Sequence, residues 1–124
     1  MSRVLVPAAA VPGFPEATTL LLDPVEGALG LYALGSPQAA GLRLFVLDAA
    51  LHLADYKPVF TNEQMALVGD PEPGSRGVLV IVNTSDHHAT VNLFAPLVFN
   101  ADTGSCAQLI LEGQEWPIRW ALPH

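Results

Sequence analysis

The chain has 124 residues, of which 51% are hydrophobic and 14% charged, and its formal net charge at pH 7 is −7. This length suits one domain with its own core, and the composition excludes a disordered chain. The negative charge disfavours direct binding of nucleic acid, which depends on neutralising phosphates. It favours a basic protein partner or serves solubility alone. Because charged residues are few, we expect exposed apolar area, which is typical of binding surfaces.

Short strands separated by turns dominate the first part of the chain. The turn Pro12-Gly13-Phe14-Pro15 is predicted to present an aromatic side chain, and Gly30 indicates a bulge or a close backbone approach. Residues 49–57 are predicted to form a loop that runs into a short extended piece. Apolar and β-branched residues predict strands over Ser2–Pro7, Thr18–Asp23, Leu29–Leu34 and Leu42–Asp48.

The segment Thr61–Val68 is the one predicted helix. Thr61 is a natural N-cap, and Gln64 three residues later completes a capping box. Met65 and Val68 lie one turn apart and are expected to face the core. A helix of about two turns is not stable alone, so packing must hold it.

The stretch Ala89–Leu111 is the most informative of the chain and predicts a hairpin that follows a buried strand over Val78–Asn83. Asn100–Gly104 has the residues of a turn. Pro96 cannot donate to a β-ladder, so it marks an edge, a bulge or a break; the strand is then either an edge or a central strand that is covered on both faces and bends at the proline. Alternation predicts one strand face made of Val91, Leu93, Ala95, Leu97 and Phe99 and the other made of Asn92, Phe94, Pro96, Val98 and Asn100.

The end of the chain carries apolar residues at every second position. Trp116, Ile118 and Trp120 predict a last strand with docked tryptophans, in a tail over Gln114–His124 that is expected to be partly flexible. Together these elements predict a single domain over residues 1–124. It is mostly β, a small antiparallel barrel or sandwich with one short helix.

Residues with reactive side chains form no recognisable catalytic or metal-binding motif. The single cysteine, Cys106, permits no internal disulfide and is expected in the core. His87 and His88 are adjacent, so in a strand they would point to opposite faces and not share one metal ion. We therefore expect neither enzyme activity nor a cofactor. The chain also shows neither a signal peptide nor an apolar run long enough for a membrane span, which favours the cytoplasm.

The run Thr90–Asn100, TVNLFAPLVFN, resembles the signature TANLLAPIVIN of the flagellar assembly factor FliW family. Similar pieces follow the family's order over Pro12–Leu111: PGF at Pro12–Phe14, Asp55-Tyr56 where the family has PDY, and QLIL at Gln108–Leu111. Alanine stands at position 54 in place of the family's proline. The resemblance implies a small β-barrel-like fold.

The resemblance also implies a function. FliW-like proteins are non-enzymatic adaptors that bind newly made flagellin in the cytoplasm. They also bind the translational regulator CsrA, a basic RNA-binding dimer, and relieve its repression of flagellin synthesis. Membership of this family would give the chain flagellin and CsrA as partners, without direct contact to nucleic acid or a membrane.

Eight residues are candidates for partner binding under this hypothesis. Core packing is the alternative role for Phe14 and Tyr56, and local backbone hydrogen bonding is the alternative for Asn92 and Asn100. A second hypothesis is a ligand-binding protein or enzyme with a pocket lined by Asp48, His52 and Tyr56. The candidates for partner binding are Phe14, Asp55, Tyr56, Asn92, Phe94, Pro96, Val98 and Asn100.

Overall fold

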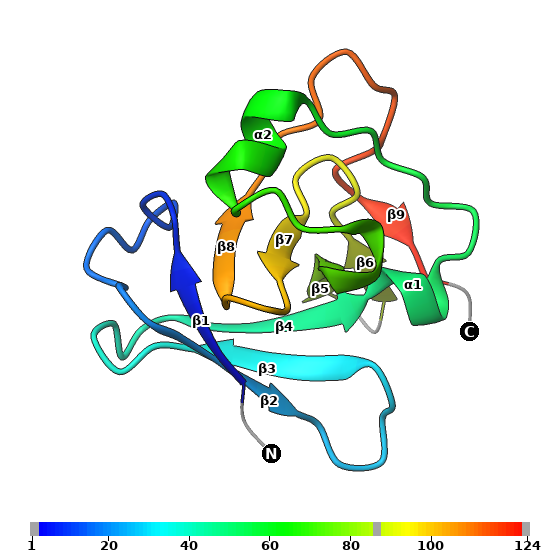
Figure 1. The fold of residues 1–124 in the computed structure, drawn as a ribbon. Helices are drawn as coiled ribbons and strands as arrows, with labels where there is room; N and C mark the ends of the chain where they lie inside the picture. The colour runs from blue at the N-terminus through cyan, green and yellow to red at the C-terminus, as the bar shows by residue number, and fades with distance from the viewer. Residues whose placement is uncertain (1–2, 86–87, 123–124) are drawn as a thin grey trace.

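The computed structural model describes residues 3–85 and 88–122 (Figure 1). The strands are β1 (Arg3–Pro7), β2 (Leu20–Pro24), β3 (Leu31–Gly35), β4 (Arg43–Asp48), β5 (Arg76–Ser85), β6 (His88–Val91), β7 (Leu97–Asn100), β8 (Ser105–Gln108) and β9 (Trp120–Ala121). The helices are α1 (Ala49–His52), α2 (Asn62–Leu67) and the 3₁₀ helix η1 (Pro73–Ser75).

Seven of the strands close into a barrel. Their order is β4-β3-β2-β1-β8-β7-β5, and pairing of β5 with β4 completes the ring. Every pair in the ring is antiparallel except β1 and β8, which run parallel with Val6 opposite Ser105. Strands β6 and β9 extend the sheet beyond the ring from the far half of β5. The predicted fold class, a mostly β domain with an antiparallel barrel, is confirmed.

The inside of the barrel is filled by inward-facing side chains of the ring strands. In β1, Leu5 is fully buried, whereas its neighbours Val4 and Val6 point outward and are 54% and 52% exposed. This alternation follows from the two-residue period of an extended strand. The interior cluster comprises Leu5, Ala17, Leu20, Leu22, Leu34, Ala39, Leu42, Val46, Leu79, Leu97 and Cys106.

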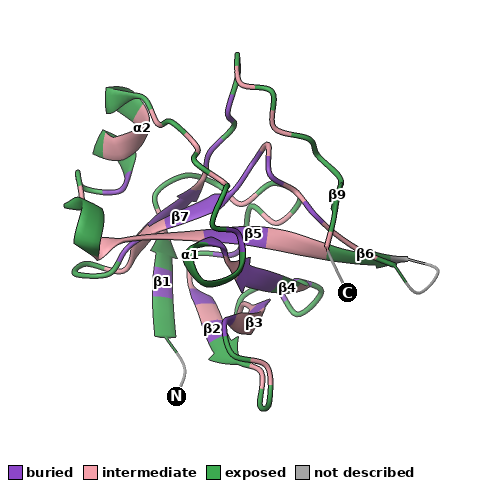
Figure 2. Cartoon of the chain, turned by 90° about the vertical axis from the view of Figure 1, so that its right-hand side faces the viewer, coloured by how far each residue is buried: buried purple, intermediate pink, exposed green. Residues whose placement is uncertain are grey.

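Two further apolar clusters lie on the outside of the barrel. One joins Val68 at the end of α2 to Val98 of β7 and Ala107 of β8. The other joins α1, outward residues of β4 and β5, and the tail, with Val80 and Val91 at its centre. Figure 2 shows buried residues on β4, on β7 and in a short stretch of β5, whereas α2 and the segment leading to β9 lie at the periphery. The barrel wall is therefore covered on both of its faces along β5.

Most predicted elements are present with boundaries shifted by a few residues. The capping box of α2 is confirmed, since the Gln64 backbone N–H donates to Thr61 Oγ1 and the Thr61 N–H donates to Gln64 Oε1, each at 3.0 Å. The predicted loop over residues 49–57 begins with the short helix α1, whose N-cap Asp48 accepts from the Ala50 N–H. The close approach at Gly30 is also confirmed, because a Cβ there would lie 2.7 Å from His52 Nε2.

The prediction of one continuous strand from Val91 to Phe99 is wrong. The chain pairs with β5 as β6, leaves the ladder over Asn92–Pro96, and returns as β7. Those five residues stand opposite only two residues of β5, because Val91 pairs with Val82 and Leu97 pairs with Leu79. The predicted two faces therefore do not exist as such, and Pro96 marks a break in a central strand.

Two observations concern the ends of the described chain. The tail strand is shorter than predicted, since β9 holds only Trp120 and Ala121. Partial flexibility of the tail stays a prediction. None of the described helices is long and apolar enough to cross a membrane.

Candidate functional site

The residues Asn92–Pro96, which we call the signature loop, form a compact turn outside the barrel ring. Asn92 organises it, because its Oδ1 accepts hydrogen bonds from the backbone N–H groups of Phe94 at 3.0 Å and Ala95 at 3.1 Å. The Asn92 N–H donates in turn to the carbonyl of Ile81 on β5. Leu111 N–H donates to the Phe94 carbonyl, which ties the loop to the segment after β8. The loop is thus held to β5 and to the segment after β8.

Tyr56 ties the connection between α1 and α2 to the signature loop. Its hydroxyl donates to the carbonyl of Leu93 at 2.7 Å, and its ring meets that of Trp116 edge to face at 4.8 Å between centroids. Burial raises the pKa of the Tyr56 phenol above its ordinary value, so the hydroxyl keeps the proton that it donates. The Leu93 N–H donates to the carbonyl of Pro117. Loop, connection and tail therefore form one hydrogen-bonded unit.

Gln114 makes a second link between the tail and the α1–α2 connection. Its side-chain Oε1 accepts from the Val59 N–H at 2.9 Å, and its Nε2 donates to the Val59 carbonyl at 2.7 Å. The same Oε1 accepts from Trp116 Nε1 at 3.2 Å. One amide side chain thus pairs with a backbone segment as a neighbouring strand would and also positions the Trp116 ring.

A cleft of about 180 Å³ opens where these three segments meet. We call it the tail cleft. Trp120 on β9 is 38% exposed at this cleft, and Ile118 two residues earlier is 58% exposed. Asp55 supplies an exposed carboxylate to its wall. The cleft is lined by His52, Leu53, Ala54, Asp55, Tyr56, Leu93, Trp116 and Trp120.

The remaining candidates for partner binding lie mostly in the interior. Pro96 and Val98 are fully buried, and Asn100 is nearly so. The Asn100 amide is occupied locally: Nδ2 donates to the Val68 carbonyl at 2.9 Å, and Oδ1 accepts from Asp102 N–H at 2.9 Å. Phe14 lies half-buried over a different part of the barrel, packed against the interior cluster. The candidates therefore do not form one surface.

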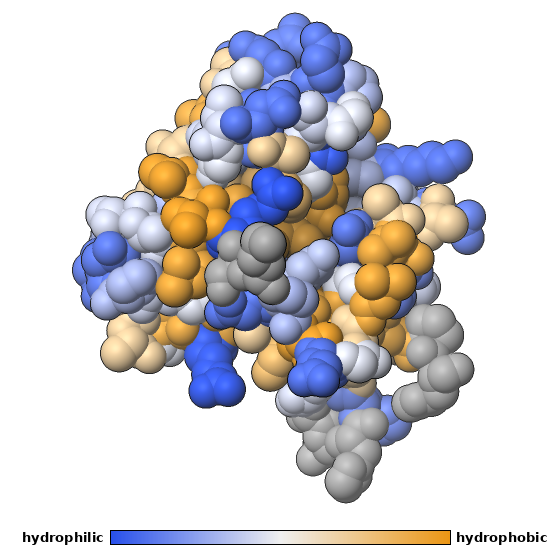
Figure 3. Space-filling view, turned by 60° about the horizontal axis from the view of Figure 1, so that its bottom comes forward, coloured by the Kyte–Doolittle hydropathy of each residue, from blue (hydrophilic) through white to orange (hydrophobic). Residues whose placement is uncertain are grey.

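The predicted single surface is therefore wrong, because the eight candidates lie in different parts of the molecule. A role in partner binding stays a prediction for each of them. Asp55 is exposed, and Phe14, Tyr56, Asn92 and Phe94 keep partial exposure. Of these, the structure brings Asp55 and Tyr56 together at the tail cleft, beside Leu93 of the signature loop. Exposed apolar residues are indeed numerous, as the low charge predicts, and Figure 3 shows apolar area interspersed with hydrophilic area on the side of β2 and β3.

The structure does not assemble the alternative pocket of Asp48, His52 and Tyr56. His52 Nε2 lies 2.6 Å from the Leu29 carbonyl, so it carries the proton and donates to the β2–β3 turn. Asp48 caps α1, and the Tyr56 hydroxyl reaches Leu93. Asp48 and Tyr56 line one pocket and His52 and Tyr56 line the tail cleft, so neither of these two pockets is lined by all three residues.

Sequence reasoning missed the exposed part of the tail. Trp116 and Trp120 were both expected to be docked, yet only Trp116 packs against Tyr56, while Trp120 stays partly exposed. The apolar residues at every second position predicted one strand with both tryptophans on the same face. Strand β9 is only two residues long, however, so Trp116 lies outside it. Within residues 3–85 and 88–122, no cluster of His, Cys, Asp and Glu side chains is suited to a metal ion. His87 lies outside these residues.

Comparisons with known proteins agree with this architecture. The FliW protein family matches residues 2–122. A flagellar assembly factor FliW of Heliobacterium modesticaldum is 32% identical over 104 residues, which make up 82% of this chain and 68% of that protein. The crystal structure of a flagellar assembly factor FliW matches the fold with a TM-score of 0.88, over 98% of this chain and 86% of the other, at 19% identity. The chain belongs to the FliW family of flagellar assembly factors.

Proposed function

We propose that the protein is a non-enzymatic cytoplasmic adaptor that binds newly made flagellin and antagonises the translational regulator CsrA. Family membership over nearly the whole chain is the observation that carries this proposal. Competition of the two partners for the adaptor would couple the synthesis of flagellin to its use in flagellum assembly.

The charge of the chain supports a basic partner. Twelve acidic residues stand against five basic ones. A basic RNA-binding dimer such as CsrA would be attracted by this field, because complementary charge speeds encounter and selects partners. The same charge disfavours competition for the RNA itself, whose phosphates repel an acidic protein.

The tail cleft and the adjacent edge of β9 supply a surface for a polypeptide. Strand β9 ends the sheet order, so its outer edge pairs with no strand in the described part of the chain. An unpaired edge can receive an added strand, and exposed aromatic residues are common anchors of interfaces. Trp120 and Ile118 supply apolar area, and Asp55 supplies a charge for a basic residue. We therefore place partner binding at this cleft.

The proposal is tested by mixing the purified protein with flagellin monomer and, separately, with CsrA. Binding is measured by isothermal titration calorimetry and by co-elution in size-exclusion chromatography. Trp120→Ser is expected to weaken binding of at least one partner by tenfold or more, because anchors of this kind contribute about 2 kcal/mol or more. Val4→Ser is the matched control, since Val4 is an exposed apolar strand residue on β1, far from β9 in Figure 1.

Two results would contradict different parts of the proposal. If the unaltered protein binds neither flagellin nor CsrA, the adaptor function is wrong. If it binds them but Trp120→Ser and Val4→Ser have the same affinity, the function holds and the tail cleft is not the interface. Phe94→Asp is a second probe, expected to weaken binding with little change in melting temperature. A variant that unfolds would show that Phe94 belongs to the core.

A further inference from the structure

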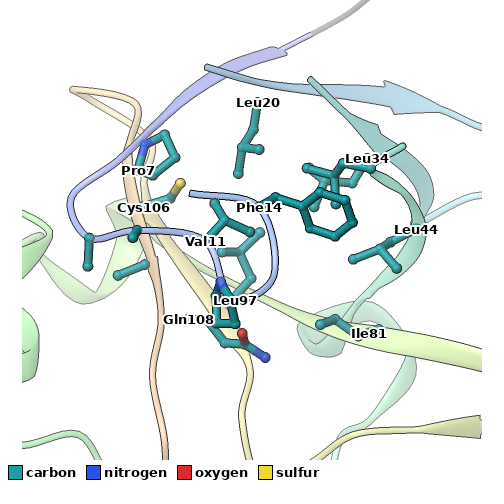
Figure 4. Close-up of a pocket in the computed structure, with 15 residues that line it drawn as sticks. Pro7, Val11, Phe14, Leu20, Leu34, Leu44, Ile81, Leu97, Cys106 and Gln108 are labelled. Atoms are coloured by element: carbon teal, nitrogen blue, oxygen red, sulfur yellow. The ribbon is translucent and has the colours of Figure 1, made fainter. Parts of the chain in front are cut away.

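One mouth of the barrel leads into an apolar cavity of about 100 Å³ (Figure 4). Its cover is the connection between β1 and β2, residues Ala8–Thr19, which we call the strap. Val11 and Phe14 of the strap face the barrel, where Leu20, Leu34 and Leu97 form the opposite wall. This cavity is separate from the tail cleft, since the two share no lining residue.

The strap is attached to the barrel mainly by side-chain packing. Phe14 N–H donates to the Val11 carbonyl at 2.9 Å, and Ala17 N–H donates to the Phe14 carbonyl at 3.0 Å. Within the described residues, backbone hydrogen bonds of positions 9–16 stay inside the strap, while Ala8 N–H reaches Cys106 on β8. Displacing the Phe14 ring would therefore cost its packing against the interior cluster but no hydrogen bond to the barrel wall.

The chemistry of the lining selects an uncharged, apolar occupant. None of its residues is charged, and Gln108 supplies the one amide side chain. The Cys106 thiol is neutral, because burial raises its pKa to about 12. A water molecule needs two to four polar partners, and a wall of leucine, valine and alanine side chains does not supply them.

The size of the cavity narrows the occupant further. An apolar cavity of about 150 Å³ accepts benzene, so this smaller one suits a branched aliphatic group of about four carbons. That is the side chain of leucine or isoleucine. Around the mouth, Ala9, Ala10 and Pro12 are exposed and form an apolar rim. A free hydrocarbon would leave the rim uncovered, whereas a polypeptide would bury it.

We propose that the barrel mouth is a binding site for one leucine or isoleucine side chain of a polypeptide partner, inserted between Phe14 and Leu97. The flanking residues of the partner are uncharged or basic, because residues 4–42 contain no lysine or arginine and Glu16 is the only charged residue of the strap. Gln108 lies at the cavity wall; its Nε2 already donates to the Ala95 carbonyl at 3.2 Å, so its Oε1 is the atom that can accept a hydrogen bond from a backbone N–H of the inserted segment. This proposal does not depend on the proposed function, because the occupant is inferred from the volume and the apolar lining of the cavity and not from family membership.

The test uses N-acetyl-leucinamide as the probe and N-acetyl-alaninamide as its matched control. Two-dimensional NMR of the isotope-labelled full chain is expected to show saturable shifts for Phe14, Leu97 and Cys106 with the leucine probe, in the millimolar range. Nuclear Overhauser contacts are expected between the leucine methyl groups and the Phe14 ring. Cys106→Leu, which fills the cavity, is expected to abolish these shifts, and Cys106→Ala, which enlarges it, to retain them.

The contacts measured in the unaltered protein decide the matter even if Cys106→Leu does not fold. Leucine-specific shifts with methyl contacts to Phe14 would support the site. Absence of saturable shifts, or equal shifts with the alanine probe, would overturn it. Binding of cyclopentane without binding of the capped leucine would also overturn it and would assign the cavity to a free apolar molecule instead.

Discussion

Replacing Asn100 by alanine is the sharpest test of how this barrel is held together. Asn100 ends β7 and lies in the interior. Its side chain forms hydrogen bonds with one backbone carbonyl in one segment and with two backbone N–H groups in another. Nδ2 donates to the Val68 carbonyl at the end of α2, while Oδ1 accepts from Asp102 at 2.9 Å and Thr103 at 3.4 Å in the β7–β8 turn. Asn100→Ala removes all three hydrogen bonds at once.

The expected loss of unfolding free energy is about 3 kcal/mol. The two short hydrogen bonds contribute about 1 kcal/mol each, and the Val68 carbonyl, left without its donor, adds about 1 kcal/mol more. The longer bond to Thr103 adds little, because hydrogen bonds weaken with distance. For a chain of 124 residues this loss lowers the melting temperature by about 10 °C.

Urea unfolding followed by tryptophan fluorescence measures this loss directly. Asn92→Ala is the matched control, because Asn92 also makes two hydrogen bonds to nearby backbone N–H groups but is only half-buried. Water can replace its bonds in part, so a loss of about 1 kcal/mol is expected there. A loss below about 1 kcal/mol for Asn100→Ala, or one no larger than that of Asn92→Ala, would refute this account.

Three further changes probe other contacts. Tyr56→Phe is expected to lower the unfolding free energy by about 1 kcal/mol, since the Leu93 carbonyl loses its donor, and an unchanged thermal denaturation curve would contradict this. Thr61→Ala is expected to cost about 1 kcal/mol through the lost N-cap of α2, and Asn62→Ala serves as the control in urea unfolding. Because the pKa of Cys106 is raised from 9.0 to about 12, its contribution to stability is fully present below pH 9 and is lost as the pH rises towards 12. Burial raises the pKa of Tyr56 as well, which also makes stability fall as the pH rises. Urea unfolding at several alkaline pH values should therefore show an unfolding free energy that falls with pH, and falls less steeply in Cys106→Ala. An equally steep fall in Cys106→Ala would contradict the role of the thiol.

The order of elements could be predicted because local patterns and local turns largely determine it. The capping box at Thr61, the turn after Asn100 and the outward and inward alternation of β1 all follow from residues a few positions apart. Pro96 indicated an edge, a bulge or a break, but the departure of the chain from the ladder at Asn92 could not be predicted, because the alternation of apolar residues continues through the loop. What removes Asn92–Pro96 from the ladder is the pair of hydrogen bonds to Asn92 and the missing N–H of Pro96.

The candidate site was predicted only in part, for a related reason. Asp55 and Tyr56 meet the tail because Tyr56 contacts Leu93 and Trp116, which lie 37 and 60 residues further along the chain. No periodicity spans such separations. The burial of Val98 likewise depends on Val68, at the end of α2, which packs against the outer face of β7 and β8, and strand patterns alone do not specify this contact.

The parallel seam between β1 and β8 has a consequence for how the chain folds during synthesis. Val6 and Pro7 pair with Ser105 and Cys106, so β1 is synthesised well before its partner β8, and the ring cannot close until β8 has followed. Such distant pairing slows folding and leaves strand edges unprotected in the meantime. Until β8 emerges, β1 has an unpaired edge and the ring stays open at this seam.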